Sequence, residues 1–281
     1  MLKFVFLLSC LFSIAFTGNP ICMSGYTMAN NKCWKSFPEA TERNADEICR
    51  MNGGGILATL KNSIDNRALL NFISGTGITH LWLGMKCYGH SILSCTWDDR
   101  TDVQYYNFAN GFPNSNYGDC VYYDASYSSA QWWSTSCDYK LPFVCELPVT
   151  TQEIDGCDTP QNYNNHCYIL MPSPASFSQA QRACVEYTNS NLVSIHSYLE
   201  NRFISYIYRN QTTNGWTGGM TPGSTLIMWT DESPDDYNNF RGSGNGTCIS
   251  MINAANQTGN WYTGDCNMEY PYICKRAIRS T

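Results

Sequence analysis

Charge is scarce in this sequence, and basic clusters are missing. Lysine, arginine, aspartate and glutamate together make up 14% of the 281 residues, and the formal net charge is −6. A nucleic-acid-binding protein presents clustered lysine and arginine, so this composition argues against that class of partner. Aromatic residues make up another 14% of the chain, which provides ample apolar surface for a folded core and excludes intrinsic disorder.

The motifs of common catalytic sites are also missing. The chain contains no His-Glu-x-x-His, no Gly-x-Ser-x-Gly and no P-loop. The glycine runs at 53–55 and 242–246 lack the strand–turn–helix context of a phosphate-binding loop. The four histidines show no metal-ligand spacing: His80, His90, His166 and His196. We therefore predict that the protein is not an enzyme.

Long hydrophobic runs are missing too, except at the N-terminus. Lys3, the apolar run 4–16 and the small residues Ala15 and Gly18 predict a signal peptide over residues 1–18. The alternative is a membrane anchor, but a span needs roughly 20 apolar residues and this run is shorter. The short polar tail, residues 278–281, carries no lipid-anchor signal. We expect a secreted, extracellular protein without a membrane anchor.

Cysteine, in contrast, is abundant, with 15 residues. Such a number is typical of a secreted chain stapled by disulfides. Cys10 leaves with the signal peptide, and the others form two series whose first three members lie 134 or 135 residues apart and whose last three lie 128 or 129 apart. The first series alone carries Cys87 and Cys95. The simplest interpretation is a duplicated domain with an extra cystine loop in the first copy.

The text around the cysteines also repeats, and it predicts an α+β fold. Ser-x-x-Glu/Gln capping boxes at 36–39 and 176–179 predict the start of a first helix in each copy. Runs at 120–123 and 248–251 predict later strands, and helices followed by strands indicate the α+β class. Apolar residues at helical spacing predict a second helix in each copy, with these faces: Ile64, Ala68, Leu69, Phe72 and Ile73; Leu199, Phe203, Ile204, Ile207 and Tyr208.

The order of motifs resembles that of the C-type lectin-like domain, taken twice. Each copy has, in this order, a Trp-x-Gly element, a Trp-x-Asp strand end, a Tyr/Trp-x-Asn-Trp-like motif and a closing cysteine strand. In the first copy these four motifs lie at 81–85, 97–99, 105–108 and 143–146. In the second copy they lie at 215–218, 229–231, 237–240 and 272–275. The resemblance covers roughly residues 20–277. It implies two disulfide-stapled domains, each with two helices, antiparallel β-sheets and a long loop. We place them at 19–147 and 157–277, joined by a linker at 148–156. The Cys87–Cys95 pair resembles the secreted, multi-domain nematode branch of the family.

The resemblance also implies the disulfide pairing, which spacing alone leaves open. Domain one is expected to contain Cys22–Cys33, Cys49–Cys145 and Cys120–Cys137, which leaves Cys87–Cys95 as a further pair. Domain two is expected to contain Cys157–Cys167, Cys184–Cys274 and Cys248–Cys266.

Calcium-dependent members of this family hold one calcium in the long loop through Glu-Pro-Asn or Gln-Pro-Asp, a nearby acid and Trp-Asn-Asp. Domain one has Phe-Pro-Asn at 112–114, Gly118 in place of the acid and Trp-Trp-Ser at 132–134. Domain two has no proline in its loop, residues 240–248, and Trp-Tyr-Thr at 261–263. Calcium needs about 6–8 oxygen ligands. We therefore expect no calcium at this site, and no cofactor, in either domain.

Two groups of loop acids could still hold a cation: Asp98, Asp99 and Asp102, and Asp231, Glu232, Asp235 and Asp236. The plainer interpretation is that they shape turns, as Asp does. For ligand binding the candidates are Asn114, Tyr117 and Trp133, because aromatic faces stack on sugars and favour protein interfaces. The alternative is that such aromatic residues fill the core, which is the family position of Trp132.

Three N-glycosylation sequons lie in domain two, at Asn210, Asn245 and Asn256. A glycan on Asn245 would crowd the loop where a ligand would bind, so domain one is the favoured binding domain. The leading hypothesis is a secreted recognition protein that binds a glycan or an extracellular protein without the usual calcium, with an innate-immune role by family analogy. The alternatives are a structural extracellular-matrix or cuticle-associated protein and a calcium-dependent lectin with displaced ligands.

Overall fold

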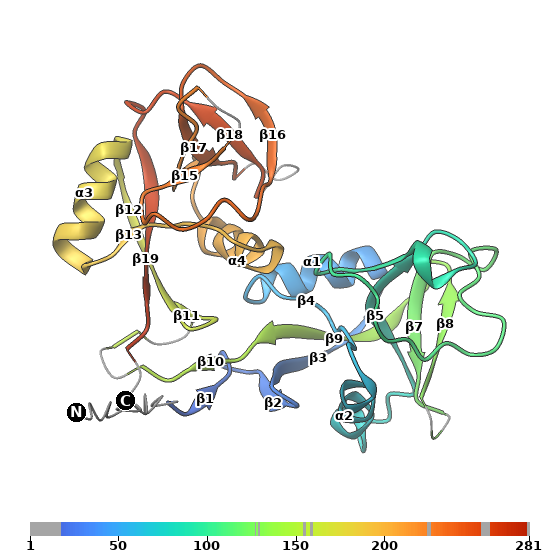
Figure 1. Ribbon diagram of the computed structural model, residues 1–281. Coiled ribbons are helices and arrows are strands. Elements are labelled where there is room, and N and C mark those ends of the chain that lie inside the picture. Colours follow the sequence, from blue (N-terminus) through green and yellow to red (C-terminus); the bar gives the residue numbers. More distant parts are fainter. Residues whose placement is uncertain are drawn as a thin grey trace, which may run out of the picture.

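The computed structural model describes residues 18–126, 128, 130–153, 156–157, 160–223, 226–253 and 259–279. The predicted signal peptide up to residue 17, the sequon at Asn256 and the last two residues of the tail lie outside this part of the chain. Two lobes lie beside one another, each with a β-sheet and two helices (Figure 1). This arrangement confirms the α+β prediction with tandem domains.

Domain one is built on one eight-stranded sheet in the order β2-β3-β9-β5-β7-β8, with β4 on β9 and β6 on β5. Strands β5 and β9 run parallel, and the other pairs are antiparallel. The elements are β2 (Thr27–Ala29), β3 (Lys32–Ala40), α1 (Glu42–Met51), β4 (Ile56–Leu57), α2 (Ser63–Ile73), β5 (His80–Cys87), the short 3-10 helix η1 (Ile92–Ser94), β6 (Cys95–Trp97), β7 (Cys120–Asp124), β8 (Gln131–Thr135) and β9 (Leu141–Pro148).

Domain two repeats this plan on a nine-stranded sheet in the order β11-β12-β19-β14-β17-β18-β16, with β13 on β19 and β15 on β14. Between the domains, β1 (Pro20–Ile21) pairs with β10 (Thr150–Thr151). The elements of domain two are β11 (Asn162–Tyr163), β12 (His166–Ala175), α3 (Phe177–Thr188), β13 (Asn191–Leu192), α4 (Tyr198–Tyr208), β14 (Gly215–Met220), β15 (Met228–Trp229), β16 (Phe240–Ser243), β17 (Cys248–Met251), β18 (Trp261–Gly264) and β19 (Tyr270–Ala277).

The two cores contain the same tryptophan arrangement. Trp132 lies edge-on to Trp97 at a centroid distance of 5.7 Å and donates its indole N–H to Asn66 of α2 at 2.9 Å. Trp261 lies edge-on to Trp229, also at 5.7 Å, and donates to Asn201 of α4 at 2.8 Å. Trp132 is fully buried. A buried indole needs a hydrogen-bond acceptor, and the second helix of each copy supplies it.

Seven disulfides staple the described residues, and they follow the pairing that the family resemblance implies. Domain one contains Cys22–Cys33, Cys49–Cys145, Cys87–Cys95 and Cys120–Cys137. Domain two contains Cys157–Cys167, Cys184–Cys274 and Cys248–Cys266. The Cys49–Cys145 and Cys184–Cys274 bonds each join the first helix to the last strand of their domain.

The capping-box prediction is right in domain two and wrong in domain one. Ser176 and Gln179 form the reciprocal capping box that begins α3. In domain one, residues 36–39 belong instead to β3, where Ser36 pairs with Val144 of β9, and α1 begins at Glu42 after its N-cap Thr41. Ladder hydrogen bonds to β9 therefore outweigh the local capping signal at 36–39.

The predicted second helices are present, with one error in their buried faces. In α4, Phe203, Ile204 and Tyr208 are buried as expected, and Ser197 caps the helix by accepting from Glu200 N. In α2, Ile64 is 65% exposed, because Asp65 turns inward from the same first turn.

Helix α4 packs against domain one, and a glycine makes the close approach possible (Figure 1). Gly54 has a φ of +71°, and a Cβ there would lie 2.5 Å from Cα of Phe203. Beside it, the buried Arg202 donates Nη2 to the carbonyl oxygen of Gly55 at 2.6 Å and pairs with Asp46 Oδ1 at 3.0 Å. The two domains are therefore joined by a desolvated, charge-assisted contact.

An apolar layer continues this contact between the domains. Tyr163 of β11 stacks on Phe203 with ring centroids 3.9 Å apart, and Leu147 and Met23 of domain one pack in the same hydrophobic cluster.

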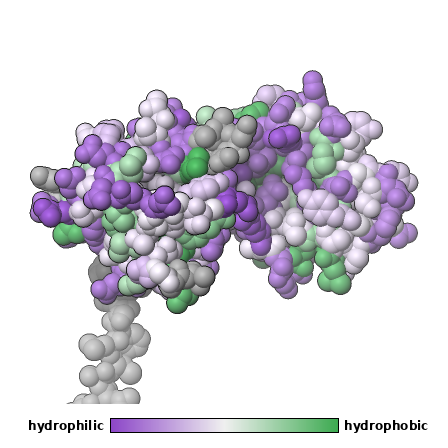
Figure 2. Space-filling model, turned by 90° about the horizontal axis from the view of Figure 1, so that it is seen from above, coloured by the Kyte–Doolittle hydropathy of each residue, from purple (hydrophilic) through white to green (hydrophobic). Residues whose placement is uncertain are grey.

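No helix among the described residues is long and apolar enough to cross a membrane. In the view from above, hydrophilic residues dominate the surface and hydrophobic ones lie in small separate groups (Figure 2).

Candidate functional site

The long loop of domain one carries an aromatic cluster. Phe112 lies 4.8 Å from Trp133 of β8 and 5.4 Å from Tyr117, measured between ring centroids. Tyr117 is 62% exposed, and Trp133 is half-buried. The Phe112–Pro113 peptide bond is cis. Two of the predicted ligand-binding residues, Tyr117 and Trp133, therefore both contact Phe112, and both remain at least partly exposed.

Asn114, the third predicted residue, shapes the loop. Its backbone N–H donates to the hydroxyl of Ser134 at 3.0 Å, and its side-chain oxygen accepts from the backbone N–H of Asn116 at 3.1 Å. The one amide that this loop shares with the family's calcium motif is thus already engaged within the loop.

Close strand contacts explain why glycine stands where the family has an acid. A Cβ on Gly118 would lie 2.3 Å from the carbonyl oxygen of Thr135, at a φ of +127°. Gly246 stands at the same place in domain two, with a φ of +145° and a Cβ position 2.1 Å from the oxygen of Gly264. Neither backbone has room for a carboxylate-bearing side chain.

The corresponding loop of domain two is partly a strand. Strand β16 pairs in parallel with β18, and Gly244 N donates to the carbonyl oxygen of Thr263 at 3.0 Å. The sequon residue Asn245 follows and is exposed, as is Asn210 at the end of α4. Part of this loop is thus hydrogen-bonded into the sheet as strand β16, unlike the loop of domain one with its aromatic cluster.

Potential metal-ligand atoms gather in two places in the described part of the chain, and each includes a disulfide. Glu42 lies with Cys120 and Cys137, and Glu153 lies with Cys157 and Cys167. Cysteines in a disulfide have no thiolate to donate. These groups are structural.

The loop acids take several different roles. Asp235 accepts from the backbone N–H of Ile227 at 2.9 Å, as a turn-shaping residue does. Asp98 has one buried carboxylate oxygen without a hydrogen-bond partner in the described residues. Burial, together with the nearby carboxylates of Asp46 and Glu42, raises the pKa of Asp98 to about 8. Asp99 contacts Lys61 and Thr101 in domain one, and Asp231 accepts hydrogen bonds from Ser194 and Ser233 in domain two.

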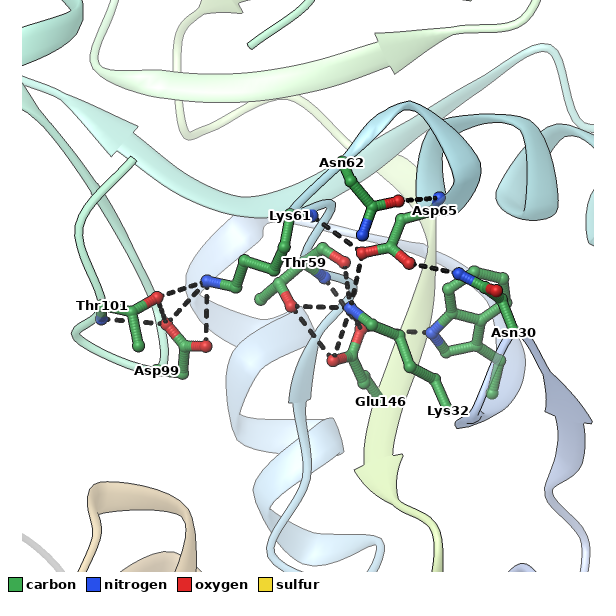
Figure 3. A network of polar contacts seen from close by, with 10 residues as sticks. Asn30, Lys32, Thr59, Lys61, Asn62, Asp65, Asp99, Thr101 and Glu146 are labelled. Carbon is green, nitrogen blue, oxygen red and sulfur yellow. Dashed lines mark hydrogen bonds and ion pairs between the residues drawn. The ribbon is translucent and has the colours of Figure 1, made fainter. Parts of the chain in front are cut away.

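A closed polar network fills domain one between β3, the end of β9 and the start of α2 (Figure 3). The Lys32 ammonium donates to the backbone oxygen of Thr59 at 2.6 Å. It also lies 3.1 Å from Glu146 Oε1 and 3.4 Å from Asp65 Oδ2. Every group in this network has an opposite charge or a hydrogen-bond donor beside it.

A second lysine closes the edge of the same network (Figure 3). Lys61 Nζ lies 2.9 Å from Asp99 Oδ2 and donates to Thr101 Oγ1 at 2.5 Å. The ammonium also lies 4.6 Å from the centroid of the Trp97 ring. Burial raises the pKa of Asp99, but the hydrogen bonds from Thr101 and Lys61 outweigh burial and hold this pKa below its usual value.

Domain two has an open pocket at the equivalent place. Its volume is about 590 Å³, and its walls come from β12, β19, the start of α4 and the loop that follows β15. Lys275 Nζ lies 2.6 Å from Glu200 Oε1, and His196 Nδ1 lies 2.7 Å from Asp236 Oδ1. No sequence motif predicts this pocket. Aligning the two copies by their cysteines places His166 and His196 opposite Lys32 and Lys61, which marks the exchanged residues but not the cavity.

The match to known proteins agrees with this geometry. The family model of the lectin C-type domain matches residues 39–147 and 173–276. C-type lectin domain-containing protein 38 of Caenorhabditis elegans is 39% identical over 271 residues, which cover 93% of this chain and 69% of that protein. The chain therefore belongs to the C-type lectin domain family, with two tandem domains.

More distant relatives share the same domain in other settings. C-type mannose receptor 2 of Mus musculus is 26% identical over 259 residues, which cover 84% of this chain but 17% of the receptor. Among solved structures, the carbohydrate-recognition domain of the mouse scavenger receptor C-type lectin is 25% identical, with a TM-score of 0.38. That match covers 44% of this chain and 99% of the domain, so it concerns a single domain.

Proposed function

We propose that the protein is a secreted, non-enzymatic recognition protein that binds a glycan or an extracellular protein through domain one. The observation that carries this proposal is the cluster of Phe112, Tyr117 and Trp133 at the long loop. Aromatic faces stack on the apolar face of a sugar ring and are favoured in protein interfaces.

The binding is proposed to need no calcium. The loop end of domain one offers Gly118 and Ser134 where calcium-binding relatives carry oxygen-rich acids and amides. The side-chain oxygen of Asn114 is engaged by Asn116. One amide and one hydroxyl fall well short of the 6–8 oxygens that calcium takes.

Secretion and glycosylation belong to the same proposal. The predicted signal peptide and the disulfide-rich lobes fit an oxidising compartment. The exposed Asn210 and Asn245 stand in sequons. Secreted protein is expected to lose apparent mass on treatment with a peptide N-glycosidase. An innate-immune role rests on family analogy and is proposed on that ground alone.

A glycan array of the secreted protein, run in calcium and again in EDTA, tests the binding proposal. One relative is named a mannose receptor, so mannose-containing glycans are the first probes of interest. Equal binding in both buffers, lost in Trp133→Ala and Tyr117→Ala, is the expected result. Tyr106→Ala is the matched control, because Tyr106 is 58% exposed against 62% for Tyr117 and lies outside the cluster.

The other outcomes correspond to the alternatives. Binding that EDTA abolishes would overturn the calcium-free site and identify a calcium-dependent lectin with displaced ligands. Absence of binding in both buffers, together with no extracellular protein captured through domain one, would favour a structural extracellular-matrix or cuticle-associated role.

A further inference from the structure

Domain one contains a cradle for an ammonium group, which its own lysine fills. Asp99 and Thr101 form a tight turn in which the backbone N–H of Thr101 donates to Asp99 Oδ1 at 3.0 Å. The Lys61 ammonium lies against both side chains, 3.0 Å from Asp99 Oδ1 and 2.5 Å from Thr101 Oγ1. A carboxylate, a hydroxyl and the three donors of an ammonium suit one another chemically.

Domain two keeps the cradle but not the lysine. Asp231 and Ser233 repeat the turn, with Ser233 N donating to Asp231 Oδ1 at 3.1 Å. Histidine replaces the lysine, because His196 follows Cys184 at the same distance as Lys61 follows Cys49. The His196 ring turns away to Asp236, 2.7 Å from its carboxylate. Among the described residues, no lysine or arginine lies within ion-pair distance of Asp231.

The remaining lysine of this pocket is committed elsewhere. Lys275 stands where Glu146 stands in domain one, and its ammonium donates to the carbonyl oxygen of Ser194, the counterpart of Thr59, to which Lys32 donates. It pairs with Glu200 at 2.6 Å and donates to Ser194 O at 3.0 Å. It also donates to Ser194 Oγ at 3.3 Å, and this hydroxyl donates in turn to Asp231 Oδ2 at 2.5 Å. Lys275 thus reaches the cradle carboxylate only through the Ser194 hydroxyl.

The cradle carboxylate, Asp231, faces the cavity. Burial raises the pKa of Asp231, but hydrogen bonds from Ser194 and Ser233 outweigh burial and hold this pKa below its usual value. Asp231, Ser233 and Asp236 all line the pocket of about 590 Å³. Two carboxylates thus face this cavity. The side chain of Lys61 fills the equivalent space in domain one, and domain two has no lysine at that position.

We propose that this pocket of domain two binds a hydroxylated ligand through a free primary ammonium, as an amino sugar carries. The ammonium takes the place that Lys61 fills in domain one, against Asp231 and Ser233. The rest of the wall mixes polar and apolar surface, and the hydroxyls of Ser194, Ser197 and Tyr168 are among its polar groups. A sugar presents both hydroxyls and an apolar ring face, and such a wall suits both. The volume lies within the usual range for a small-ligand pocket.

This inference rests on the proposed recognition function and adds a second site, in the other domain. The binding proposal for domain one and the pocket of domain two are tested separately, because Trp133→Ala changes domain one and the variants below change domain two alone. Failure of the pocket leaves the array result of domain one untouched, and failure of the array leaves the pocket assay untouched.

Isothermal titration calorimetry of the full chain with D-glucosamine tests the pocket, with N-acetylglucosamine as the ligand that lacks the ammonium. Glucosamine is expected to bind at least about tenfold more tightly than N-acetylglucosamine, because the acetyl group removes a charge-assisted hydrogen bond. His196→Lys returns to domain two the internal ammonium of domain one. Both His196→Lys and Asp231→Asn are expected to weaken glucosamine binding at least about tenfold.

His90→Lys is the matched control, since it makes the same substitution at an exposed position of domain one. It is expected to leave the affinity unchanged, and thermal melts establish that every variant is folded. His196→Lys is informative even if Asp231→Asn unfolds, because it recreates an arrangement that domain one already tolerates. Absence of glucosamine binding, or binding that His196→Lys leaves intact, would overturn the inference. Equal affinity for Nα-acetyl-lysine amide would overturn the amino-sugar assignment.

Discussion

Arg202 offers the sharpest test of how the two domains are joined. Arg202→Ala removes a buried guanidinium that donates to Gly55 O at 2.6 and 3.1 Å and pairs with Asp46 at 3.0 Å. The carbonyl of Gly55 then loses its charged donor within a buried interface. Breaking a buried charged contact costs about 3–5 kcal/mol. Asp46 is 35% exposed, so water compensates for part of the lost ion pair. We expect a loss of about 3 kcal/mol in the free energy that couples the domains.

Differential scanning calorimetry measures this coupling. The unaltered protein is expected to unfold in one transition, because α4 cannot unfold without exposing its contact with domain one. Arg202→Ala is expected to lower the first transition and to separate the two domains into distinct steps. Arg209→Ala is the matched control, because Arg209 is exposed at the C-terminal end of the same helix and contacts Tyr206 of its own domain. A single, unshifted transition in Arg202→Ala would refute the assignment of coupling to this contact.

Two further predictions concern stability. The folded pKa of Asp98, about 8, lies above its ordinary value of 3.8, so the folded state binds the proton more tightly and the unfolding free energy falls as pH rises from 4 to 8. Asp98→Asn is expected to remove roughly 2–3 kcal/mol of this fall, seen in urea titrations at pH 5 and pH 8, whereas the exposed Asp102→Asn is not. Gly118→Ala is expected to cost about 2 kcal/mol or more in the same assay, because its Cβ would meet Thr135 O at 2.3 Å. Gly111→Ala, with a positive φ but no atom within 4 Å, should cost about 1 kcal/mol.

The duplicated fold could be read from the sequence because covalent and packing constraints recur at fixed intervals. Cysteines must meet in pairs, and Trp132 and Trp261 must each find a buried acceptor on the second helix. The start of α1 was misplaced because Ser36–Glu39 imitates the capping box of Ser176–Gln179. The cysteine spacing aligns Ser176 with Thr41 instead, which is where the structure begins the helix. A long-range repeat was here a better guide than a four-residue motif.

The contact between the domains and the pocket of domain two could not be predicted from the sequence in the same way. Gly54 looks like an ordinary turn glycine, and only the structure shows the backbone of Phe203 against it. The pocket depends on paired exchanges, in which Glu146 of one copy aligns with Lys275 and Lys61 aligns with His196. Each exchange is unremarkable alone, and their joint effect appears only when the side chains are placed around one cavity.

The buried contact between α4 and the 46–55 segment has a consequence for multivalent recognition. A flexible tether lets two binding modules adapt to many separations, whereas a joined pair presents its two loop regions at one separation and one angle. Avidity then arises only for surfaces whose repeated groups match that separation. If both domains bind, a contact such as that of Arg202 with Gly55 and Asp46 would make the protein select the spacing of the bound groups as well as their chemistry.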